Sequence, residues 1–365
     1  MDFYHTHISQ KSVQLVNEVL KSTFISAGKM ADSFEAALSQ RLGLINPVTV
    51  NSGTSALHLG LIVAGVGPGD EVIIPAQTFI ATGLAVKMCD ATPVFADIQL
   101  DTGNISPESI KQKITSKTKA IIPVHWGGYP CDMDEINAIA KEHNLVVLED
   151  AAHALGASYK NKPIGSISEL TAFSFQAIKH LTTGDGGALC CLNESISQKA
   201  RTARWFGIDR QNSQPSILGE RVYDATTIGF KYHMNDLAAA LGLGNLEDLS
   251  QILDRRAKIA GKYREQLKDV PGLTLLNYKD DRKSSNWLFT MLVERREDFI
   301  RALQEKGIPS SVVHLRIDKN SVFGGIRKDL PNQEKFNELQ ISIPVHQGLN
   351  DEDVDLIIKT IKAGW

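Results

Sequence analysis

The sequence predicts an α/β fold, in which a large domain with a mostly parallel sheet precedes a smaller C-terminal α+β domain. Strand and helix patterns alternate along the first part of the chain, and most strand segments are apolar throughout. Continuous apolar strands are typical of a parallel sheet covered by helices on both faces. The 365 residues also exceed the ~250–300 at which one hydrophobic core usually stops growing. We therefore expect two domains, 1–245 and 246–365, which meet within a long helical region.

The individual elements follow from apolar periodicity, capping residues and chain breakers. For example, Ser106-Pro107 is typical of a helix start, because serine caps the first turn and proline suits its backbone angle. Predicted helices cover 9–42, 54–63, 79–88, a segment beginning at 106, 134–143, about 235–267, 297–306 and 351–362. Predicted strands cover 48–50, 71–74, 93–95, 120–124, 145–149, 188–191 and 287–293.

The composition argues against several classes of function. The net charge is -3 and neither half of the chain is basic, so nothing indicates a nucleic acid or an anionic membrane as partner. Apolar runs fall far short of the ~20 residues of a membrane span, and the first residues do not resemble a signal peptide. The four cysteines lack C-x-x-C spacing, which indicates reduced thiols in a cytoplasmic protein. No histidine or cysteine spacing indicates a metal site.

A first candidate site is the segment Asn51-Ser52-Gly53-Thr54-Ser55, which follows a predicted strand and opens a predicted helix. Ligands of open parallel sheets bind beyond the carboxyl ends of the strands. Gly53 allows the backbone to approach a ligand closely, and the free N–H groups of Thr54 and Ser55 favour an anion such as phosphate. The alternative is an ordinary serine or threonine helix cap.

A second candidate is Asp150, which directly follows the apolar strand 145–149. A partly desolvated carboxylate stays ionised only beside a strong partner. The protonated ring nitrogen of a pyridoxal cofactor is one such partner. The alternative is a structural aspartate that caps a helix.

A third candidate is Lys179, which lies in a mostly apolar stretch before the glycine-rich turn 184–187. Desolvation lowers the pKa of a lysine and makes its amine nucleophilic toward an aldehyde. By itself Lys179 could be an ordinary surface lysine. Together, however, the three candidates supply a phosphate cradle, a carboxylate for a ring nitrogen and a Schiff-base lysine, which are the contacts that pyridoxal phosphate needs.

At these motifs the sequence resembles the DegT/DnrJ/StrS family of sugar aminotransferases, and the resemblance covers almost the whole chain. The resemblance implies the aspartate-aminotransferase-like fold of PLP-dependent transferases, fold type I, with pyridoxal 5'-phosphate as cofactor. The matching segments are NSGTSAL (51–57), GDEVIIPAQTFIAT (69–82), PVFADI (93–98), TKAIIPVHWGGYPCDMDEI (118–136), EDAAHALGA (149–157), FSFQAIKHLTTGDGG (173–187), GFKYHMNDLAAALG (229–242) and SIPVH (342–346).

The resemblance also implies a role for each residue that matches a family motif. Lys179 matches the Schiff-base lysine and Asp150 the partner of the ring nitrogen. Phe79 matches the aromatic residue that stacks on the ring, and Thr54 and Ser174 match phosphate ligands. Two further positions depart from the family: His153 stands where glutamine is frequent, near the phenolic oxygen of the ring, and Lys231 stands where asparagine commonly reaches the phosphate of a neighbouring subunit.

The resemblance implies transfer of an amino group from an amino acid, expected to be glutamate, to a keto sugar that is expected to be linked to a nucleotide. One branch of the family removes a sugar hydroxyl instead and has histidine at the lysine position, whereas this chain has Lys179 there. A sugar dehydratase and a non-catalytic cofactor-binding regulator remain the alternatives. If the role of Lys231 carries over, the active sites are shared across a homodimer.

Several other residues are weaker candidates. His125 and Trp126 end a predicted strand and could line the pocket, or could simply be buried. His314 and Arg316 lie in the C-terminal region where the family has sugar-nucleotide contacts, so we expect a substrate role or a solvated loop. We interpret Arg204 and Trp205 as structural or dimer contacts.

Overall fold

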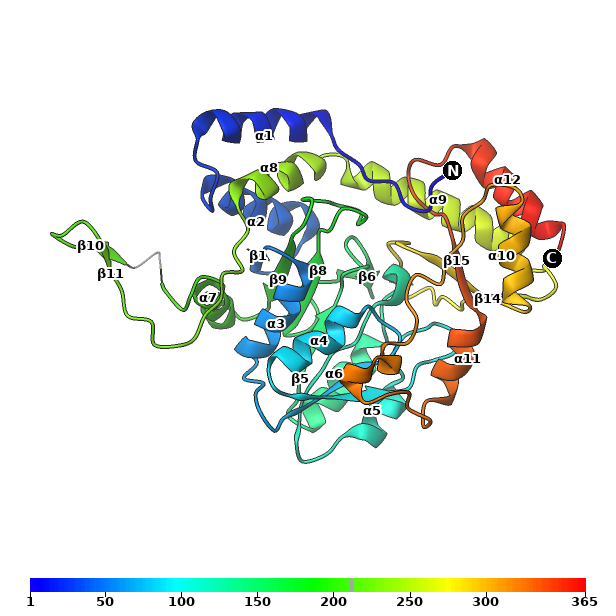
Figure 1. The fold of residues 1–365 in the computed structure, drawn as a ribbon, viewed down its shortest axis with the longest axis horizontal. Coiled ribbons are helices and arrows are strands. Elements are labelled where there is room, and N and C mark those ends of the chain that lie inside the picture. The colour runs from blue at the N-terminus through cyan, green and yellow to red at the C-terminus, as the bar shows by residue number, and fades with distance from the viewer. Residues whose placement is uncertain (210–212) are drawn as a thin grey trace.

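The computed structural model describes residues 1–209 and 213–365, and a seven-stranded sheet forms the centre of the first part of the chain (Figure 1). The strand order is β1-β9-β8-β5-β4-β2-β3. Only β9 runs against its neighbours β8 and β1, so the sheet is mostly parallel, as predicted. The strands are β1 (Pro47–Val50), β2 (Glu71–Pro75), β3 (Thr92–Ala96), β4 (Thr118–Ile121), β5 (Val146–Asp150), β8 (Leu170–Ser174) and β9 (Gly187–Cys191).

Helices cover both faces of this sheet, which explains why its strands are apolar at consecutive positions. In β2, for example, Ile73 belongs to the core on one face, whereas Val72 and Ile74 belong to the core on the other. The first core includes side chains from α2 (Lys29–Leu42), α5 (Pro107–Lys113), α6 (Met133–Glu142) and α8 (Asp236–Asn245). The second includes side chains from α3 (Gly53–Val63), α4 (Ile80–Met88) and α7 (Glu194–Ala203).

The C-terminal part of the chain forms a smaller α+β unit around a three-stranded antiparallel sheet. The strand order is β12-β14-β15, with bounds Leu273–Leu275, Phe289–Val293 and Gln340–Ile343. A separate hydrophobic core joins this sheet to α9 (Leu249–Leu267), α10 (Arg296–Gln304) and α12 (Asp351–Lys362). Helix α11 (Pro331–Leu339) packs against β14.

Two short sheets accompany the two larger ones. A hairpin of β10 (Gln214–Pro215) and β11 (Arg221–Val222) projects from the body of the molecule (Figure 1). Strands β6 (Ser158–Tyr159), β7 (Lys162–Pro163) and β13 (Arg282–Lys283) form the other sheet, which joins the large sheet region to the C-terminal part. Short 3-10 turns cover Trp126–Gly128, Ile317–Lys319 and Ser321–Phe323.

Two long predicted helices are each interrupted in the structure. The segment 9–42 forms α1 (Gln10–Ser22) and α2, and α1 ends where Thr23 adopts a left-handed conformation and its N–H bonds to the carbonyl of Leu20. The segment 235–267 likewise forms α8 and α9, with a break at 246–248. The proposed boundary between domains at residue 245 falls beside this break and stays a proposal.

Within the described ranges, no helix combines the length and apolar character needed to cross a membrane.

Candidate active site

The carboxyl ends of β1, β2, β5 and β8 surround a cavity of about 370 Å³. This is the edge at which open parallel sheets bind their ligands. The cavity is closed on another side by Trp287 and His314, which come from the C-terminal part of the chain. Its lining includes the predicted residues Gly53, Thr54, Phe79, Asp150, His153, Ser174, Lys179 and His314.

The predicted phosphate cradle lies where β1 leads into α3. Ser52 caps this helix and accepts a hydrogen bond of 3.0 Å from the N–H of Ser55. The side chain of Ser55 turns back and donates to Asn51 Oδ1 at 2.6 Å, and Ser55 does not line the cavity. Gly53 lies so close to Ser174 that a Cβ atom on it would meet the Cβ of Ser174 at 2.8 Å. Two predicted phosphate contacts are therefore neighbours at a helix N-terminus, where anions are favoured.

Asp150 is the last residue of β5 and its side chain is held by two hydrogen bonds. Thr82 Oγ1 donates to Oδ2 at 2.7 Å, and the N–H of Ala152 donates to Oδ1 at 3.2 Å. Burial raises the pKa of Asp150, while these two donors and the nearby Lys179 oppose that shift. The ionised carboxylate is therefore under-compensated and would gain from a further cationic partner.

Lys179 lies in the turn between β8 and β9 and lines the same cavity. Burial lowers the pKa of its amine to about 7, although the charge of Asp150 acts in the opposite direction. A large fraction of the amine is therefore neutral near pH 7 and is available as a nucleophile. Its Nζ atom lies 3.7 Å from the ring centroid of Trp287.

Aromatic rings form the remaining wall of the cavity. The rings of His153 and Trp287 are stacked, with centroids 3.8 Å apart and planes inclined by 16°. His314 lies between His153 and the exposed ring of Phe79, at centroid distances of 5.8 and 5.2 Å. Burial holds the pKa of His153 well below its usual value and lowers the pKa of His314 to about 4. Both imidazoles are therefore neutral at pH 7, and Nδ1 of His153 has no hydrogen-bond partner among the described residues.

Three of the weaker substrate candidates lie outside the cavity lining. His125 is fully buried and its Nε2 bonds to Glu149 at 2.8 Å. Trp126 is also buried and donates to Thr290 Oγ1 at 3.2 Å. The guanidinium of Arg316 is held by both oxygens of Asp318 at 2.7 Å. Each of these three side chains thus has a structural partner. An arginine paired in this way has few donors left for a substrate.

The residues predicted to contact a partner subunit, Arg204 and Lys231, lie in different surroundings: Arg204 is paired within its own chain, whereas Lys231 is exposed. Arg204 contacts the buried Glu35 at 2.6 Å, which agrees with the structural interpretation. Lys231 is exposed and lies outside the cavity of its own chain, yet its carbonyl accepts a hydrogen bond from Asn51 Nδ2 at 3.3 Å. Lys231 thus lies beside the phosphate cradle, and a reach of its side chain into a partner subunit stays a prediction.

The sequence analysis missed Thr82 and Trp287. Thr82 lies in the first turn of α4, and its hydroxyl oxygen is 2.6 Å from that of Thr78, which precedes the helix. The two threonines follow a buried apolar strand, and this polar pair is the signal that could have identified Thr82. Trp287 has no such local signal, because the C-terminal part of the chain brings it to the cavity.

These residues fit pyridoxal 5'-phosphate. The cradle at Gly53 suits a phosphate, the under-compensated Asp150 suits a protonated ring nitrogen, and the unpartnered Nδ1 of His153 suits a polar substituent of the ring. Lys179 supplies a nucleophilic amine for the aldehyde. Among the described residues no group of three or more histidine, cysteine, aspartate or glutamate side chains is placed to hold a metal ion. Fold and site together define a pyridoxal-phosphate-dependent enzyme of fold type I.

Comparison with known proteins narrows this class. Residues 6–362 match the DegT/DnrJ/EryC1/StrS aminotransferase family, and the chain belongs to this family. It is 38% identical over 367 residues to spore coat polysaccharide biosynthesis protein SpsC of Bacillus subtilis (97% of this chain, 94% of the relative). It is 34% identical over 354 residues to GDP-perosamine synthase of Caulobacter vibrioides (95% and 93%).

Solved structures agree. The chain superposes on sugar aminotransferase CalS13 from Micromonospora echinospora with a TM-score of 0.95 and 32% identity over 100% of both chains. It superposes on the PLP form of Spr1654 from Streptococcus pneumoniae with a TM-score of 0.91 and 32% identity (100% and 98%). The protein is thus a pyridoxal-phosphate-dependent sugar aminotransferase.

Proposed function

We propose that the enzyme moves an amino group from glutamate to a keto sugar carried on a nucleotide, and that the amino sugar serves polysaccharide biosynthesis. The observation that carries this proposal is the amine of Lys179, with a pKa of about 7, in one cavity with Asp150. Two relatives, a spore coat polysaccharide biosynthesis protein and a GDP-perosamine synthase, support the sugar nucleotide and its use.

Bound in this cavity, pyridoxal phosphate supplies an aldehyde that can carry the amino group and a ring that withdraws electrons. Lys179 would take the proton from the donor carbon and pass it to the cofactor within the same half of the cycle, and in the second half it would move a proton the opposite way, to the acceptor carbon. Asp150 would hold the ring nitrogen protonated, and the backbone around Gly53 and Thr54 would hold the phosphate. Phe79 and His314, which line the cavity, would limit the entry of water, which would compete for the proton.

Lysine at position 179 favours transamination over removal of a sugar hydroxyl. A primary amine could displace the aminated sugar and bond to the cofactor aldehyde again at the end of each cycle, which an imidazole cannot do. The two reactions differ in their products, because only transamination converts glutamate into 2-oxoglutarate.

The experiment that tests the proposal is the visible absorbance of the purified protein before and after addition of glutamate. We expect a yellow band that disappears as 2-oxoglutarate forms, and that returns when the correct nucleotide-linked keto sugar is added. Loss of the band without 2-oxoglutarate would overturn transamination of glutamate. A band that glutamate leaves unchanged, while another amino acid removes it, would do the same.

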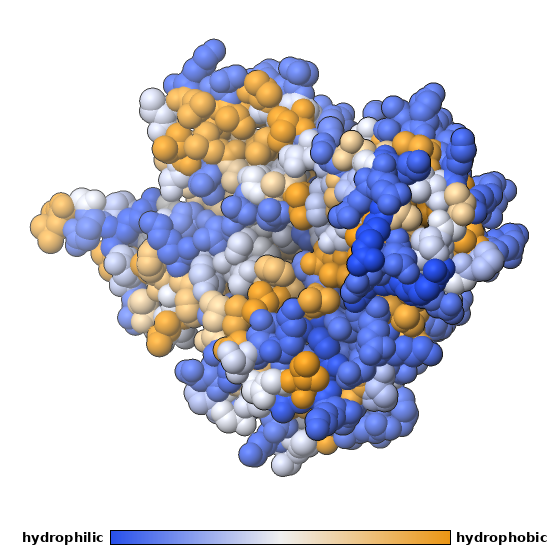
Figure 2. Space-filling model, turned by 45° about the vertical axis from the view of Figure 1, so that its right-hand side comes forward, coloured by the Kyte–Doolittle hydropathy of each residue, from blue (hydrophilic) through white to orange (hydrophobic). Residues whose placement is uncertain are grey.

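We also propose that the enzyme is a homodimer in which Lys231 reaches the phosphate of the partner subunit. Large apolar side chains are exposed near α1 and on the β10–β11 hairpin, and Figure 2 shows apolar patches on the upper part of the molecule and at the projecting tip. Such surfaces are typical of protein interfaces. The exposed apolar residues in these two regions are Ile8, Val13, Leu20, Phe24, Ile25, Ile217, Leu218, Val222 and Tyr223.

Mixed dimers test this arrangement. A Lys179→Ala chain paired with a Lys231→Ala chain retains one site with both lysines only if Lys231 acts on the partner. About half of the dimers in an equal mixture are mixed, so activity should rise to about a quarter of the wild-type value after subunit exchange. Activity no higher than the mean of the two separate variants would contradict a shared site.

For the location of the enzyme we propose the cytoplasm. Its cysteines are free and buried in the described structure, and thiols stay reduced in that compartment.

A further inference from the structure

Trp287 is the aromatic residue in direct contact with the amine of Lys179. The distance of 3.7 Å from Nζ to a ring centroid is well within the ~6 Å over which an ammonium group is attracted to a π-system. Trp287 is 2% exposed, so water does not screen this contact as it would at the surface. Indole is also the side-chain ring that attracts cations most strongly.

The indole is tied to the lysine turn and is held firmly in place. Its Nε1 donates a 3.1 Å hydrogen bond to the carbonyl of Ile178, the residue before Lys179. The guanidinium of Arg256 in α9 donates to the carbonyls of Asn286 and Trp287 at 3.3 and 3.4 Å. Movement of Trp287 and movement of the lysine turn are therefore coupled.

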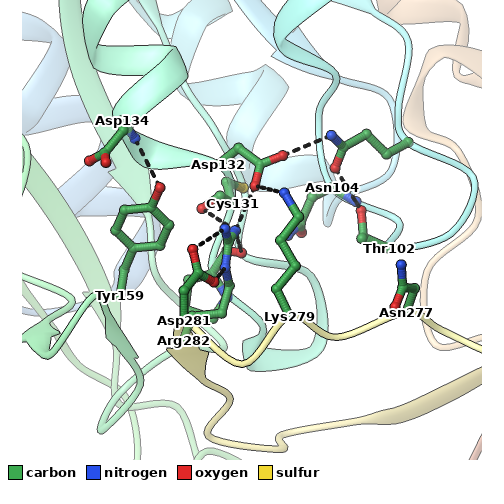
Figure 3. Close-up of polar contacts among 12 residues, drawn as sticks. Thr102, Asn104, Cys131, Asp132, Asp134, Tyr159, Asn277, Lys279, Asp281 and Arg282 are labelled. Carbon is green, nitrogen blue, oxygen red and sulfur yellow. Dashed lines mark hydrogen bonds and ion pairs between the residues drawn. The ribbon is translucent and has the colours of Figure 1, made fainter.

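A polar network fastens the chain just before Trp287. Asp132 accepts hydrogen bonds from Lys279 at 2.8 Å and Gln99 at 2.9 Å, and its Oδ1 lies 2.8 Å from Arg282 (Figure 3). Arg282 also donates to the carbonyl of Cys131 at 2.9 Å. Closer to the site, Ser285 Oγ donates to the carbonyl of His153 at 2.8 Å. The segment that carries the indole is thus anchored to the large sheet region rather than free to swing.

We propose that Trp287 is a positioning residue for catalysis, on whose ring the Lys179 amine rests whenever it is not bonded to the cofactor and carries the transferred proton. This inference rests on the proposed role of Lys179. The ring stabilises the ammonium form and keeps it beside the reacting carbon instead of letting it turn toward solvent. Trp287 acts through Lys179 and needs no contact with the substrate.

The charged groups around Lys179 do not stabilise its ammonium form once the cofactor is bound, so we assign that stabilisation to the ring of Trp287. Asp150 favours the ammonium form in the cofactor-free protein. With cofactor bound, its charge would be shared with the ring nitrogen. Burial lowers the pKa of the three histidines that face Lys179, so they stay neutral, and a neutral imidazole has no negative charge with which to hold an ammonium group. The groups that face Lys179 or share its cavity are Asp150 of β5, His153 after it, His180 and Asp185 of the same turn, and His314. Asp185 is exposed, and Asp150 is the acidic group that raises the pKa of Lys179.

A series of fluorinated tryptophans at position 287 separates electrostatics from packing. Fluorine withdraws charge from the face of the ring and weakens its attraction for cations, with little change of shape. In the cofactor-free protein, the pKa of Lys179 can be measured from the pH dependence of its acylation, followed by mass spectrometry. We expect the pKa to fall stepwise with the number of fluorine atoms, by roughly one unit at four fluorines. Fluorination of Trp365, near the C-terminus, is the matched control and should leave it unchanged.

A second readout follows proton transfer itself. With glutamate deuterated at the carbon that loses the proton, Trp287→Phe should keep part of the rate, whereas Trp287→Leu should lower kcat about tenfold or more, with a larger isotope effect and little change in KM. Thermal unfolding identifies any variant that fails to fold. If Trp287→Leu fails to fold, the fluorinated variants, which keep the shape of the ring, still test the proposal.

A constant Lys179 pKa across the fluorinated series would overturn the role of Trp287. An isotope effect in Trp287→Leu equal to that of the wild type would do so as well. Failure of the proposed function has a different signature, because Lys179→Ala would then still develop the yellow band of covalently attached cofactor.

Discussion

Thr82 donates a 2.7 Å hydrogen bond to Oδ2 of Asp150, so α4 supplies a fixed neutral donor to the carboxylate at the end of β5. This bond orients the carboxylate without neutralising it. Burial raises the pKa of Asp150, and the charge of Lys179 opposes that rise only in part. The site is thus organised around a negative charge that is stabilised fully only when the cofactor brings its ring nitrogen.

The substitution Asp150→Asn should therefore lower the kcat of the holoenzyme and raise the free energy of unfolding of the cofactor-free protein. Burial raises the pKa of Asp150, so the ionised carboxylate destabilises the cofactor-free folded state at every pH above that raised pKa. Removing the charge relieves this effect at neutral pH, whereas kcat should fall on the order of a hundredfold because a preorganised charge is lost. Urea unfolding of the cofactor-free proteins and steady-state kinetics measure the two effects.

A matched control for this pair of effects is Thr82→Val, which removes the donor but keeps the carboxylate. It should destabilise the cofactor-free protein, because the buried charge then loses a hydrogen bond. If Asp150→Asn also destabilised the cofactor-free protein, the carboxylate would be better compensated than its surroundings indicate.

Recombination of the cofactor-free protein with pyridoxal phosphate should depend on pH through Lys179. Only the neutral amine attacks an aldehyde, and the pKa of Lys179 is about 7. The rate of formation of the yellow band should therefore rise as pH increases through 7 and level off about one unit above it. Stopped-flow absorbance from pH 6 to 9 measures this profile, and a rate that rises steadily to pH 9 would contradict the lowered pKa. Lys179→Ala should show no yellow band and a turnover lower by roughly a thousandfold or more.

Much of this site could be predicted because its residues lie next to strong local signals. Asp150 and Gly53 each follow an apolar strand, and in a parallel sheet such positions meet at one edge. The preceding strand of Lys179, β8, was not predicted, although the apolar surroundings of the lysine identified its chemistry. Trp287 could not be found in this way, because its position depends on how the C-terminal part folds back onto the sheet.

Strand-end position alone also selected residues whose side chains have structural partners in the folded chain. His125 follows β4 just as Asp150 ends β5, yet His125 turns into the interior and bonds to Glu149. Sequence order does not tell which side chain at a strand end faces the ligand. The charge of Arg316 is neutralised by Asp318 and Glu334, two acidic residues of the same region, so the sequence position of the arginine did not tell whether it faces a ligand.

Glu35 should be important for stability without taking part in the chemistry. This residue of α2 is 6% exposed, and its carboxylate contacts Arg201, Arg204 and Thr49. Burial opposes its ionisation, but the two arginines outweigh that effect and lower its pKa below the ordinary 4.5. Glu35→Ala leaves the arginines unpaired and should lower the free energy of unfolding by about 3 kcal/mol.

The pH dependence distinguishes this ion pair from simple loss of packing. Because the pKa of Glu35 is lowered by folding, its contribution is present above pH 4.5 and is lost as pH falls further. The difference in stability between wild type and Glu35→Gln should therefore shrink in acid, as urea unfolding at several pH values would reveal. A difference that stays constant from pH 7 to pH 3 would show that the charge is not responsible.

Gly53→Ala should weaken cofactor binding by steric means alone. The added methyl group would meet the Cβ of Ser174 at 2.8 Å, so either the start of α3 or the end of β8 must move. Overpacking of this kind costs about 1–3 kcal/mol, which corresponds to a loss of affinity of roughly ten- to a hundredfold. Spectral titration of the cofactor-free protein with pyridoxal phosphate measures the affinity.

The matched control is Gly261→Ala in α9, where an added methyl group meets no atom within 4 Å. Alanine suits a helix interior better than glycine by roughly 0.5–1 kcal/mol, so this variant should be slightly more stable and should bind the cofactor like the wild type. Wild-type affinity in Gly53→Ala would mean that the cradle tolerates movement. The close approach of Gly53 to Ser174 would then not be what fixes the phosphate, and the backbone N–H groups of α3 would have to hold it without help from β8.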